Sequence, residues 1–548
     1  MNALPKPAAR TAPDTDIVMI GGGHNGLVCA AYLAAAGLKV TVLERRDVLG
    51  GAAVTEEFHP GFRNSVAAYT VSLLNPKVIA DLDLHRHGLR IVERKVGNFL
   101  PLEDGYLLAG PGLTHDEVAK FSARDAARLG EYEARLETIA DTLRQLVLET
   151  PPNLREGNLT GALPDLFKAL GLGGRLGGLS MTAKRDLLDL FSKSAGDWLD
   201  GWFESAPIKA LFGFDGIVGN FASPYTPGSA YVLLHHLFGE VNGKKGAWGH
   251  AIGGMGAITQ AMAACCRERG VVLRTGAAVR EVIAEKGRAQ GVVLESGETI
   301  RARAVVSNLN PKLLFGGTMV DAAQLPADFR ERIAHYRCGS GTFRMNVALK
   351  DLPRFTARPE PGDHLTAGII IAPSLDYMDR AWSDARREGW SREPVIEMLI
   401  PSTLDDTLAP PGQHVASLFC QHVAPVLPGG RDWDDCRDAV ADHMIATVER
   451  WAPGFSDLVV GRQVLSPKDL ERTFGLVGGD IFHGALSLDQ LFSARPVLGH
   501  ADHRSPVKGL YQCGSGTHPG GGVTGAPGHN AAREILRDDR WRGRLGRR

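Results

Sequence analysis

Short runs of consecutive apolar residues recur along this chain, and stretches with apolar residues at helical spacing separate them. Residues 16–20 and 39–43 form two such runs, and Ala30, Ala31 and Leu33 follow helical spacing between them. A short, continuous apolar run is typical of a strand that is buried on both faces of a parallel sheet. The first 51 residues therefore predict a strand, a helix and a second strand.

The same kinds of pattern return in two later parts of the chain. A helix is predicted over residues 253–270, and four strand-like runs follow it, at 271–274, 278–283, 289–294 and 299–306. Another sheet is predicted beyond residue 311, with strands at 342–349, 368–371, 395–400 and 414–421 and helices at 376–388 and 430–450. Strands mixed with helices in this way predict an α/β protein with more than one sheet.

Residues 114–214 have a different character. Charged and apolar residues alternate at helical spacing over 126–150, and Leu, Phe and Trp side chains are abundant over 163–214. This pattern predicts an inserted helical cap. Its apolar side chains could line a substrate tunnel, touch a lipid surface or form ordinary core, and the sequence leaves the three alternatives open.

Composition narrows the class of protein. A chain of 548 residues suggests three or four domains, and its 44% of hydrophobic residues is ample for a large core. The net charge of −1 gives no reason to expect nucleic acid as a partner. The chain shows no apolar run of 18 residues and no signal-peptide pattern, so we predict a cytoplasmic protein. The seven cysteines form no C-x-x-C pair and no metal-ligand cluster, so no metal is predicted.

The glycines after the first predicted strand carry the clearest chemical signal. Gly21, Gly23 and Gly26 have the spacing G-x-G-x-x-G. The first allows a tight turn, the second lets a pyrophosphate approach the backbone, and the third lets a helix pack closely on the strand. Glu44 ends the second strand, where a carboxylate can accept hydrogen bonds from an adenosine ribose. These residues predict the AMP end of a dinucleotide site without a ribose 2′-phosphate.

Two further glycine-rich segments extend this prediction. Gly50, Gly51 and Ala52 follow the ribose-binding acid, and close backbone approach there suits a cofactor that continues past its pyrophosphate. Residues 509–530 contain a short strand, many glycines and the start of a helix. Glycines in that position let the backbone lie flat against a ligand and direct a helix N-terminus at it.

These motifs resemble the flavin-dependent amine oxidase and phytoene desaturase superfamily, over residues 16–535. Within its phytoene desaturase-related branch, the similarity is greatest to a β-carotene ketolase and to the pyridine nucleotide-disulfide oxidoreductase domain-containing protein 2 group, in residues 23–28, 50–55, 478–484 and 517–522. The resemblance implies a Rossmann-type FAD-binding domain of the glutathione reductase-like type, a mixed-sheet substrate domain and a helical cap. It also implies FAD as the cofactor and an oxidoreductase activity.

The resemblance assigns cofactor contacts to three separated parts of the chain: Gly21, Gly23, Gly26, Glu44, Arg45, Gly50, Gly51, Ala52, Val279, Gly514, Gly521, Gly522 and Val523. Val279 is expected to contact the adenine end through its backbone. The helix that starts near Val523 is expected to point at the isoalloxazine N1–C2=O, where negative charge collects on reduction. Many flavoproteins carry an acid after the glycine of the C-terminal strand, and this chain has Ser515 there.

The same resemblance divides the chain into domains. We assign a discontinuous FAD-binding domain to residues 16–110, 250–310 and 471–536. A helical cap or substrate region is assigned to 111–249 and a substrate domain to 311–470. Residues 1–15 are expected to form a flexible N-terminal tail, and residues 537–548 a basic C-terminal tail.

The expected chemistry is hydride transfer to flavin N5, which needs a dry, shaped pocket more than an acid–base triad. His518, His250 and His483 are the candidate catalytic residues because each could move a proton or polarise a substrate oxygen, although single histidines are more often structural. Tyr69 is a candidate for the cofactor cleft. We expect an apolar substrate, isoprenoid or polyene, and a desaturation, saturation, isomerisation or ketolation.

Two other functions stay open at this stage. One is an amine or amino-acid oxidase, which residues 518–520 disfavour because they offer no aromatic side chain for an amine. The other is a flavin-stabilised interaction protein with low turnover. The chain shows no second nucleotide motif, so electrons are expected to pass directly to oxygen, a quinone or NAD(P). Peripheral membrane contact and the oligomeric state are left open.

Overall fold

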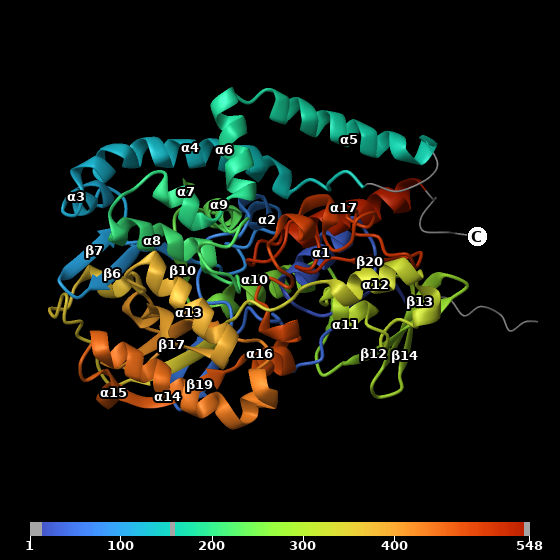
Figure 1. Ribbon diagram of the computed structural model, residues 1–548. Helices are drawn as coiled ribbons and strands as arrows, with labels where there is room; N and C mark the ends of the chain where they lie inside the picture. The colour runs from blue at the N-terminus through green and yellow to red at the C-terminus, as the bar shows by residue number, and fades with distance from the viewer. Residues whose placement is uncertain (1–13, 154–158, 542–548) are drawn as a thin grey trace, which may run out of the picture.

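The computed structural model describes residues 14–153 and 159–541. Two large sheets lie side by side, and a group of helices runs along one end of the molecule, at the top of Figure 1. Most of the two predicted tails lies outside the described residues. Thr15 already belongs to the first strand, and the last helix reaches Trp541.

The first sheet has seven strands and is parallel at its centre. Five parallel strands lie in the order β11 (Val272–Arg274), β2 (Val40–Leu43), β1 (Thr15–Ile20), β14 (Thr299–Ser307) and β20 (Leu510–Gln512). β13 (Arg288–Leu294) and β12 (Val279–Glu285) continue antiparallel from β14. The ends of each of these strands were predicted from its apolar run to within two residues. The sheet joins segments from the beginning, the middle and the end of the chain.

Both faces of β1 are buried, which explains why its sequence is continuously apolar. Ile17 and Met19 belong to a core with α1 (His24–Ala35), α10 (Met255–Glu268) and α17 (Ala526–Trp541). Val18 and Ile20 belong to the core on the other face, with β12 to β14, α11 (Pro311–Phe315) and α12 (Ala327–His335).

Glycines determine how closely α1 approaches its neighbours. A Cβ at Gly26 would lie 2.4 Å from the carbonyl oxygen of Gly21. A Cβ at Gly528, in α17, would lie 2.2 Å from the carbonyl oxygen of Asn25. Any larger side chain would push the helices apart, so α1 packs directly on the turn after β1 and on α17.

The second sheet also has seven strands, in the order β19 (Val459–Leu465), β15 (Phe343–Leu349), β18 (His414–Val423), β17 (Trp390–Leu399), β16 (Gly368–Ile371), β6 (Asn98–Leu102) and β7 (Gly105–Ala109). All neighbours are antiparallel except β16 and β6. α14 (Trp433–Trp451) packs on one face, and α13 (Leu375–Glu388) packs on the other beside the cap. β6 and β7 thus join this sheet, although they lie inside the range 16–110; the domain boundaries themselves stay a prediction.

Among the described residues between β7 and β8, seven helices build the cap: α3 (Thr114–Ala119), α4 (Ala123–Val147), α5 (Leu159–Gly177), α6 (Met181–Ser192), α7 (Ala195–Asp200), α8 (Ala206–Ile217) and α9 (Ala230–Leu237). Its core is aromatic, with Tyr132 in edge contact with Trp202 and Phe203. Five large apolar side chains on α5 and α6 are exposed: Leu166, Phe167, Leu170, Met181 and Leu188. No helix within the described residues has the length and apolar character needed to span a membrane.

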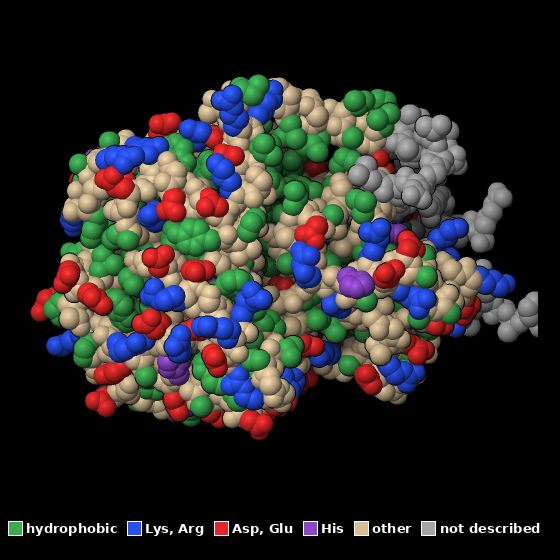
Figure 2. All heavy atoms as spheres, in the orientation of Figure 1, with side chains coloured by type: hydrophobic (Ala, Val, Ile, Leu, Met, Phe, Trp, Pro, Cys, Tyr) green, Lys and Arg blue, Asp and Glu red, His purple; other side chains and the backbone are tan. Residues whose placement is uncertain are grey.

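Shorter elements connect the sheets and the cap: β3 (Thr55–His59), β4 (Phe62–Ser65), α2 (Pro76–Asp81), β5 (Ile91–Glu93), β8 (Glu240–Val241), β9 (Lys244–Lys245), β10 (Gly249–Ala251), α15 (Phe455–Leu458) and α16 (Pro467–Phe474). Acidic and basic side chains are interspersed over the face in Figure 2. That face therefore offers no extended surface of one charge.

Replacing Gly26 by Ala tests the close packing of α1. The new Cβ would clash with the Gly21 carbonyl oxygen, so we expect a loss of roughly 1–3 kcal/mol in stability, as is usual for overpacking. Gly171→Ala is the matched control, because no atom lies within 4 Å of its added Cβ and helix propensity favours Ala by about 1 kcal/mol. Thermal melting and the FAD content per chain measure both effects; an unchanged G26A protein contradicts the packing argument.

Candidate functional site

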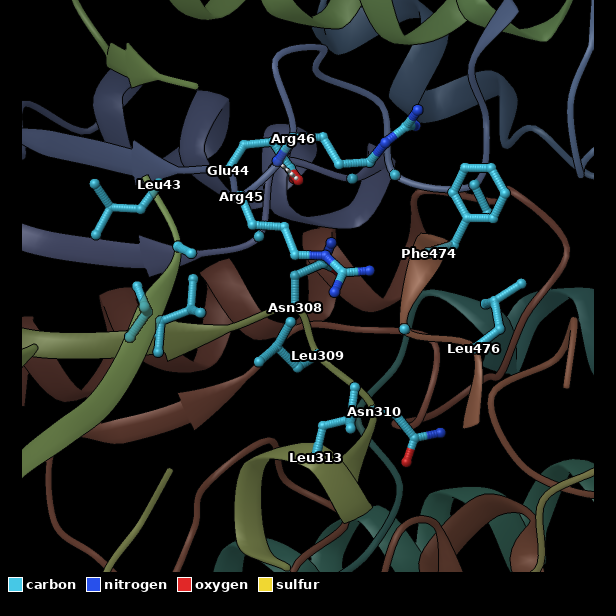
Figure 3. Close-up of a pocket in the computed structure, with 18 of the residues that line it drawn as sticks. Leu43, Glu44, Arg45, Arg46, Asn308, Leu309, Asn310, Leu313, Phe474 and Leu476 are labelled. Atoms are coloured by element: carbon cyan, nitrogen blue, oxygen red, sulfur yellow. Dashed lines mark hydrogen bonds between the residues drawn. The ribbon is translucent and has the colours of Figure 1, made fainter. Parts of the chain in front are cut away.

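A groove of about 380 Å³ runs along the carboxyl ends of β1 and β2. Figure 3 shows Glu44, Arg45 and Arg46 on one side of it, the segment 308–313 on another, and Phe474 and Leu476 on a third. Seven of the predicted cofactor residues line this groove: Gly21, Gly23, Glu44, Arg45, Gly51, Ala52 and Val279. Residues that are far apart in the sequence therefore meet in one place.

Backbone segments cross tightly at the floor of the groove. Gly23 and Gly50 form an isolated parallel bridge, and the Gly50 N–H donates to the Gly22 carbonyl oxygen over 2.9 Å. A Cβ on Gly51 would lie 3.1 Å from the Gly23 Cα. Gly26 and Gly50 do not line the groove; they allow the close approach that shapes it.

Glu44 is buried at the end of β2, and its carboxylate organises the loops around it. One oxygen accepts a hydrogen bond from the Gly22 N–H over 2.8 Å, and the other accepts one from the Arg46 N–H over 3.0 Å. Arg45 donates to the Thr473 carbonyl oxygen over 2.7 Å. The acid therefore holds the glycine turn, and Arg45 ties the groove to the last turn of α16.

A second cavity, of about 120 Å³, continues from the groove, and we call it the substrate cavity. The two spaces share His24, Ala52, Leu476, His483 and Ser515. Gly522 and Val523 line the substrate cavity, as do Tyr69, Thr70, His236, Trp248 and a set of apolar side chains. Gly521 instead lines an adjoining space with Leu73 and His235, and Gly514 packs against the backbone of Asn308.

Two histidines lie where the groove meets the substrate cavity. Burial, with a contribution from the nearby His483, lowers the pKa of His24 to about 3. Burial, with a contribution from Arg495, lowers the pKa of His483 to about 4. His24 Nε2 and His483 Nδ1 are buried and have no hydrogen-bond partner among the described residues. Both rings are neutral at pH 7 and present polar atoms to a ligand in this space.

Two charged side chains fix the loop that carries His483, one through backbone N–H groups and the other through backbone carbonyl oxygens. The Asp480 carboxylate accepts hydrogen bonds from the Gly339 and Phe482 N–H groups, each over 2.8 Å. The fully buried Arg495 donates to the carbonyl oxygens of Phe482 and Ser515, also over 2.8 Å each. One arginine thereby links the His483 loop to the C-terminal glycine loop, since Ser515 lines both cavities.

The other two candidate histidines lie outside both cavities. His518 is buried, and its Nε2 lies 3.0 Å from the Leu146 carbonyl oxygen, which ties the C-terminal loop to α4. His250 Nε2 lies 2.9 Å from an oxygen of Asp405, which also accepts the Gly253 N–H over 2.7 Å. Burial would raise the pKa of Asp405, but the hydrogen bonds from His250, Thr407 and Gly253 outweigh it and lower that pKa to about 2. These contacts give His518 and His250 structural roles, and a catalytic role for either stays a prediction.

Sequence reasoning missed His24 and the segment from Asn308 to Asn310, all of which line the groove. A signal was available for both. His24 follows the second glycine of G-x-G-x-x-G and so begins the helix that faces the ligand. Asn308 follows the carboxyl end of β14, the edge at which open α/β sheets bind their ligands.

The donor set fits an FAD molecule. The turn of Gly21 to Gly23 and the N-terminus of α1 would hold the pyrophosphate, and Glu44 would lie at the ribose. Val279 lines the groove and would meet the adenine, while Gly522 and Val523 line the adjoining cavity and would meet the isoalloxazine ring. The unpartnered ring nitrogens belong to His24 and His483, which line both spaces. Fold and site together define an FAD-dependent oxidoreductase.

Comparison with known proteins gives the family. The chain belongs to the flavin-containing amine oxidoreductases, whose family model matches residues 26–536. It is 43% identical to pyridine nucleotide-disulfide oxidoreductase domain-containing protein 2 of Rattus norvegicus, over 96% of this chain and 94% of that protein. This confirms the predicted group, the enzyme class and FAD as the cofactor.

More distant relatives include one of the subunits of limonene dehydrogenase from Castellaniella defragrans and a lycopene-forming phytoene desaturase of Pseudescherichia vulneris. The identities are 27% and 24%, over 95% and 93% of this chain and 94% and 96% of theirs. Among solved structures, an oxidoreductase from Methanosarcina mazei matches with a TM-score of 0.59 and 16% identity, over 95% of this chain and all of that chain. The predicted fold class is thereby confirmed.

His518→Gln tests whether this histidine is a buried structural group. Burial lowers the pKa of His518 to about 4, against about 6.5 when unfolded, so its contribution is complete above pH 6.5 and is lost as the pH falls toward 4. Between pH 7 and pH 5 this loss is about 2 kcal/mol, or about 2 °C of melting temperature. We expect the variant to lose less stability than the natural protein over this range.

His115→Gln is the control for that experiment, because His115 is exposed on α3. It should leave the pH dependence of melting unchanged. Equal pH dependence in H518Q and the natural protein would contradict the structural assignment, and loss of substrate turnover at full FAD content would instead favour catalysis by His518.

Proposed function

We propose that this enzyme oxidises an apolar isoprenoid substrate by transfer of a hydride from one substrate C–H bond and loss of a proton from the adjacent carbon to a neutral imidazole of the cavity, so that a C=C bond forms. The observation that carries the proposal is the character of the substrate cavity: its surface is apolar or neutral, and the charges behind its wall are mainly positive. FAD supplies the two-electron acceptor when it is bound. The chain's own residues then have to bind a hydrocarbon, orient it and exclude water.

The wall of the substrate cavity suits a hydrocarbon. Leu73, Val218, Leu476, Ile481 and Phe482 contribute apolar surface. The two titratable rings shared with the groove, those of His24 and His483, are neutral at pH 7 because burial lowers their pKa values. Among the described residues no charged side chain lies in this lining, so water gains little by remaining there and an apolar substrate gains by replacing it.

The charges nearest the cavity lie one side chain behind its wall. Tyr69 donates a hydrogen bond to Glu397 over 2.5 Å, and the guanidinium of Arg344 lies 4.5 Å from the Tyr69 ring centre. Arg94 donates to Thr70, another lining residue, over 2.6 Å. Burial raises the pKa of Glu397 and lowers the pKa values of Arg94 and Arg344. Two guanidinium groups against one carboxyl group disfavour a cationic substrate.

Two relatives support the isoprenoid class. The limonene dehydrogenase and the phytoene desaturase are named after limonene and phytoene, which are isoprenoid hydrocarbons without charge. The apolar lining of the substrate cavity, which would also receive the isoalloxazine ring at Gly522 and Val523, suits a small terpene or one end of a longer chain.

An amine is the second candidate substrate, and one observation favours it. Tyr69 and Trp248 both line the substrate cavity. They offer aromatic side chains against which an amine could lie, which residues 518–520 lack. A bound ammonium group would, however, meet the positive side of the Arg94, Arg344 and Glu397 cluster. We therefore place the amine second.

Anaerobic mixing of the FAD-loaded enzyme with a panel of substrates tests the proposal. We expect limonene or a detergent-dispersed polyene to bleach the visible flavin absorbance faster than alkylamines or putrescine. The preference should be about tenfold or more, because an ammonium beside an excess guanidinium costs about 2 kcal/mol at an effective dielectric of 20. Faster reduction by the amines would overturn the isoprenoid assignment.

Arg94→Met tests the charge argument separately. Removing one guanidinium lowers the excess of positive charge near the cavity. The rate of flavin reduction by an alkylamine should therefore rise about tenfold relative to the rate with limonene. Arg90→Met is the control because this arginine is exposed and outside the cavity lining. An unchanged ratio in R94M, with normal FAD content and melting temperature, would show that the cluster does not select the substrate.

A further inference from the structure

The cap contains a large cavity of its own, which we call the cap cavity. Its volume is about 480 Å³, and α4, α8, α9 and the segment after β9 form its walls. It shares no lining residue with the cofactor groove or the substrate cavity. α9 separates it from the substrate cavity, because Leu233 and Leu237 line the one and His236 lines the other.

Most of the cap cavity's wall is apolar or aromatic. Tyr132 and Leu136 come from α4, Phe212 comes from α8, and the two leucines of α9 complete this surface. Aliphatic side chains alternating with two aromatic rings can hold a hydrocarbon group, and the ring faces also attract a cation. Such a surface resembles a ligand site more than a packing defect, which would be smaller and lined by aliphatic groups alone.

Two carboxyl groups interrupt this apolar wall. Asp215 is the more deeply buried of them, and burial alone raises its pKa to about 7. Glu133 is exposed at the opening, and partial burial of its carboxyl group raises its pKa. Neither carboxylate has a hydrogen bond or an ion pair with any other described residue. A half-buried carboxylate without a partner, as at Asp215, is costly, and a cation that reached it would lower that cost.

The remaining charges of the lining are already paired. Glu137 accepts a hydrogen bond from Arg144 over 2.6 Å, and Lys245 donates to Asp141 over 2.6 Å. Neither group is available to neutralise Asp215. Burial raises the pKa of Glu397, and Asp215 raises it further, so the two acids act on one another. The inner end of the cap cavity is therefore an acidic site in an apolar wall.

We propose that the cap cavity is a second ligand site, which binds an amphipathic ammonium compound. The hydrocarbon part lies against Tyr132, Phe212 and the leucines, and the ammonium group pairs with Asp215, with Glu133 nearer the opening. Its chemistry is the opposite of that of the substrate cavity, where the excess charge is positive. The ligand would contact α9, the helix that carries His236 into the substrate cavity.

Calorimetric titration of the FAD-loaded full chain with n-octylamine tests this site. We expect one molecule to bind per chain, whereas n-octanoate, with the same chain length and the opposite charge, does not bind. Asp215→Asn, which keeps the shape of the side chain, should weaken octylamine binding by tenfold or more. Glu131→Gln, on the exposed side of α4, is the matched control and should bind as the natural protein does.

Gly130→Leu provides a second variant that leaves both carboxylates in place. Gly130 lines the cap cavity within α4 and has no atom within 4 Å of an added Cβ, so leucine should fill the space and keep the helix. Binding of octylamine should be lost in this variant with normal melting and FAD content. Unchanged octylamine binding in both D215N and G130L would overturn the proposal, as would a natural protein that binds octylamine and octanoate equally.

The flavin spectrum separates this proposal from the proposed function. Octylamine that occupied the substrate cavity as a substrate would bleach the flavin under anaerobic conditions. Binding to the cap cavity leaves the flavin oxidised. Heat of binding with an oxidised flavin, abolished in G130L, supports the cap cavity, and bleaching that persists in G130L contradicts it and favours amine oxidation instead.

Discussion

The close packing of α1 is the constraint on which the rest of the structure depends. Gly26 lets the helix rest on the carbonyl of Gly21, and Gly528 lets α17 rest on the carbonyl of Asn25. These contacts fix the position of the α1 N-terminus, where the positive end of the helix dipole and free N–H groups favour a phosphate. His24, the first residue of α1, is thereby placed between the cofactor groove and the substrate cavity. A small displacement of this helix would alter both spaces together.

A second principle governs the charges around the substrate. Polar groups that touch the substrate cavity are neutral, and the ionised groups lie behind them. Arg495 holds the loops of His483 and Ser515 through carbonyl oxygens, and Arg94 and Arg344 act on the cavity through Thr70 and Tyr69. A guanidinium satisfied by carbonyls or stacked on a ring keeps its charge without drawing water into the cavity. The field of these groups still reaches a bound substrate, because buried charges are only weakly screened.

The sequence predicted what depends on short-range pattern. The glycine spacing, the acid at the end of β2 and the apolar runs of the first sheet are local features, and a groove lies beside them. That the predicted residues contact the cofactor there stays a prediction. Contacts between distant segments left no such pattern. The Tyr69 and Glu397 side chains lie 328 positions apart, and β6 pairs with β16 far along the chain. The structural role of His518 could not be predicted either, because its partner is a carbonyl group at the end of a cap helix. His24 lay inside a recognised motif, but at a position that the motif does not specify.

The Arg495 link has a consequence for how the chain is made. Ser515, Gly522 and Val523 would complete the site near the isoalloxazine ring, and they are synthesised almost 500 residues after the glycine turn of Gly21 to Gly23. Synthesis proceeds from the N-terminus, so the glycine turn that receives the pyrophosphate exists long before the loop that closes around the other end of the cofactor. The early chain can offer FAD only part of its site, and the stabilisation that a ligand gives to a folded protein comes late. Flavin supply should therefore govern the yield of folded protein at the stage when the C-terminal glycine loop is already present, more than the rate at which the chain is translated.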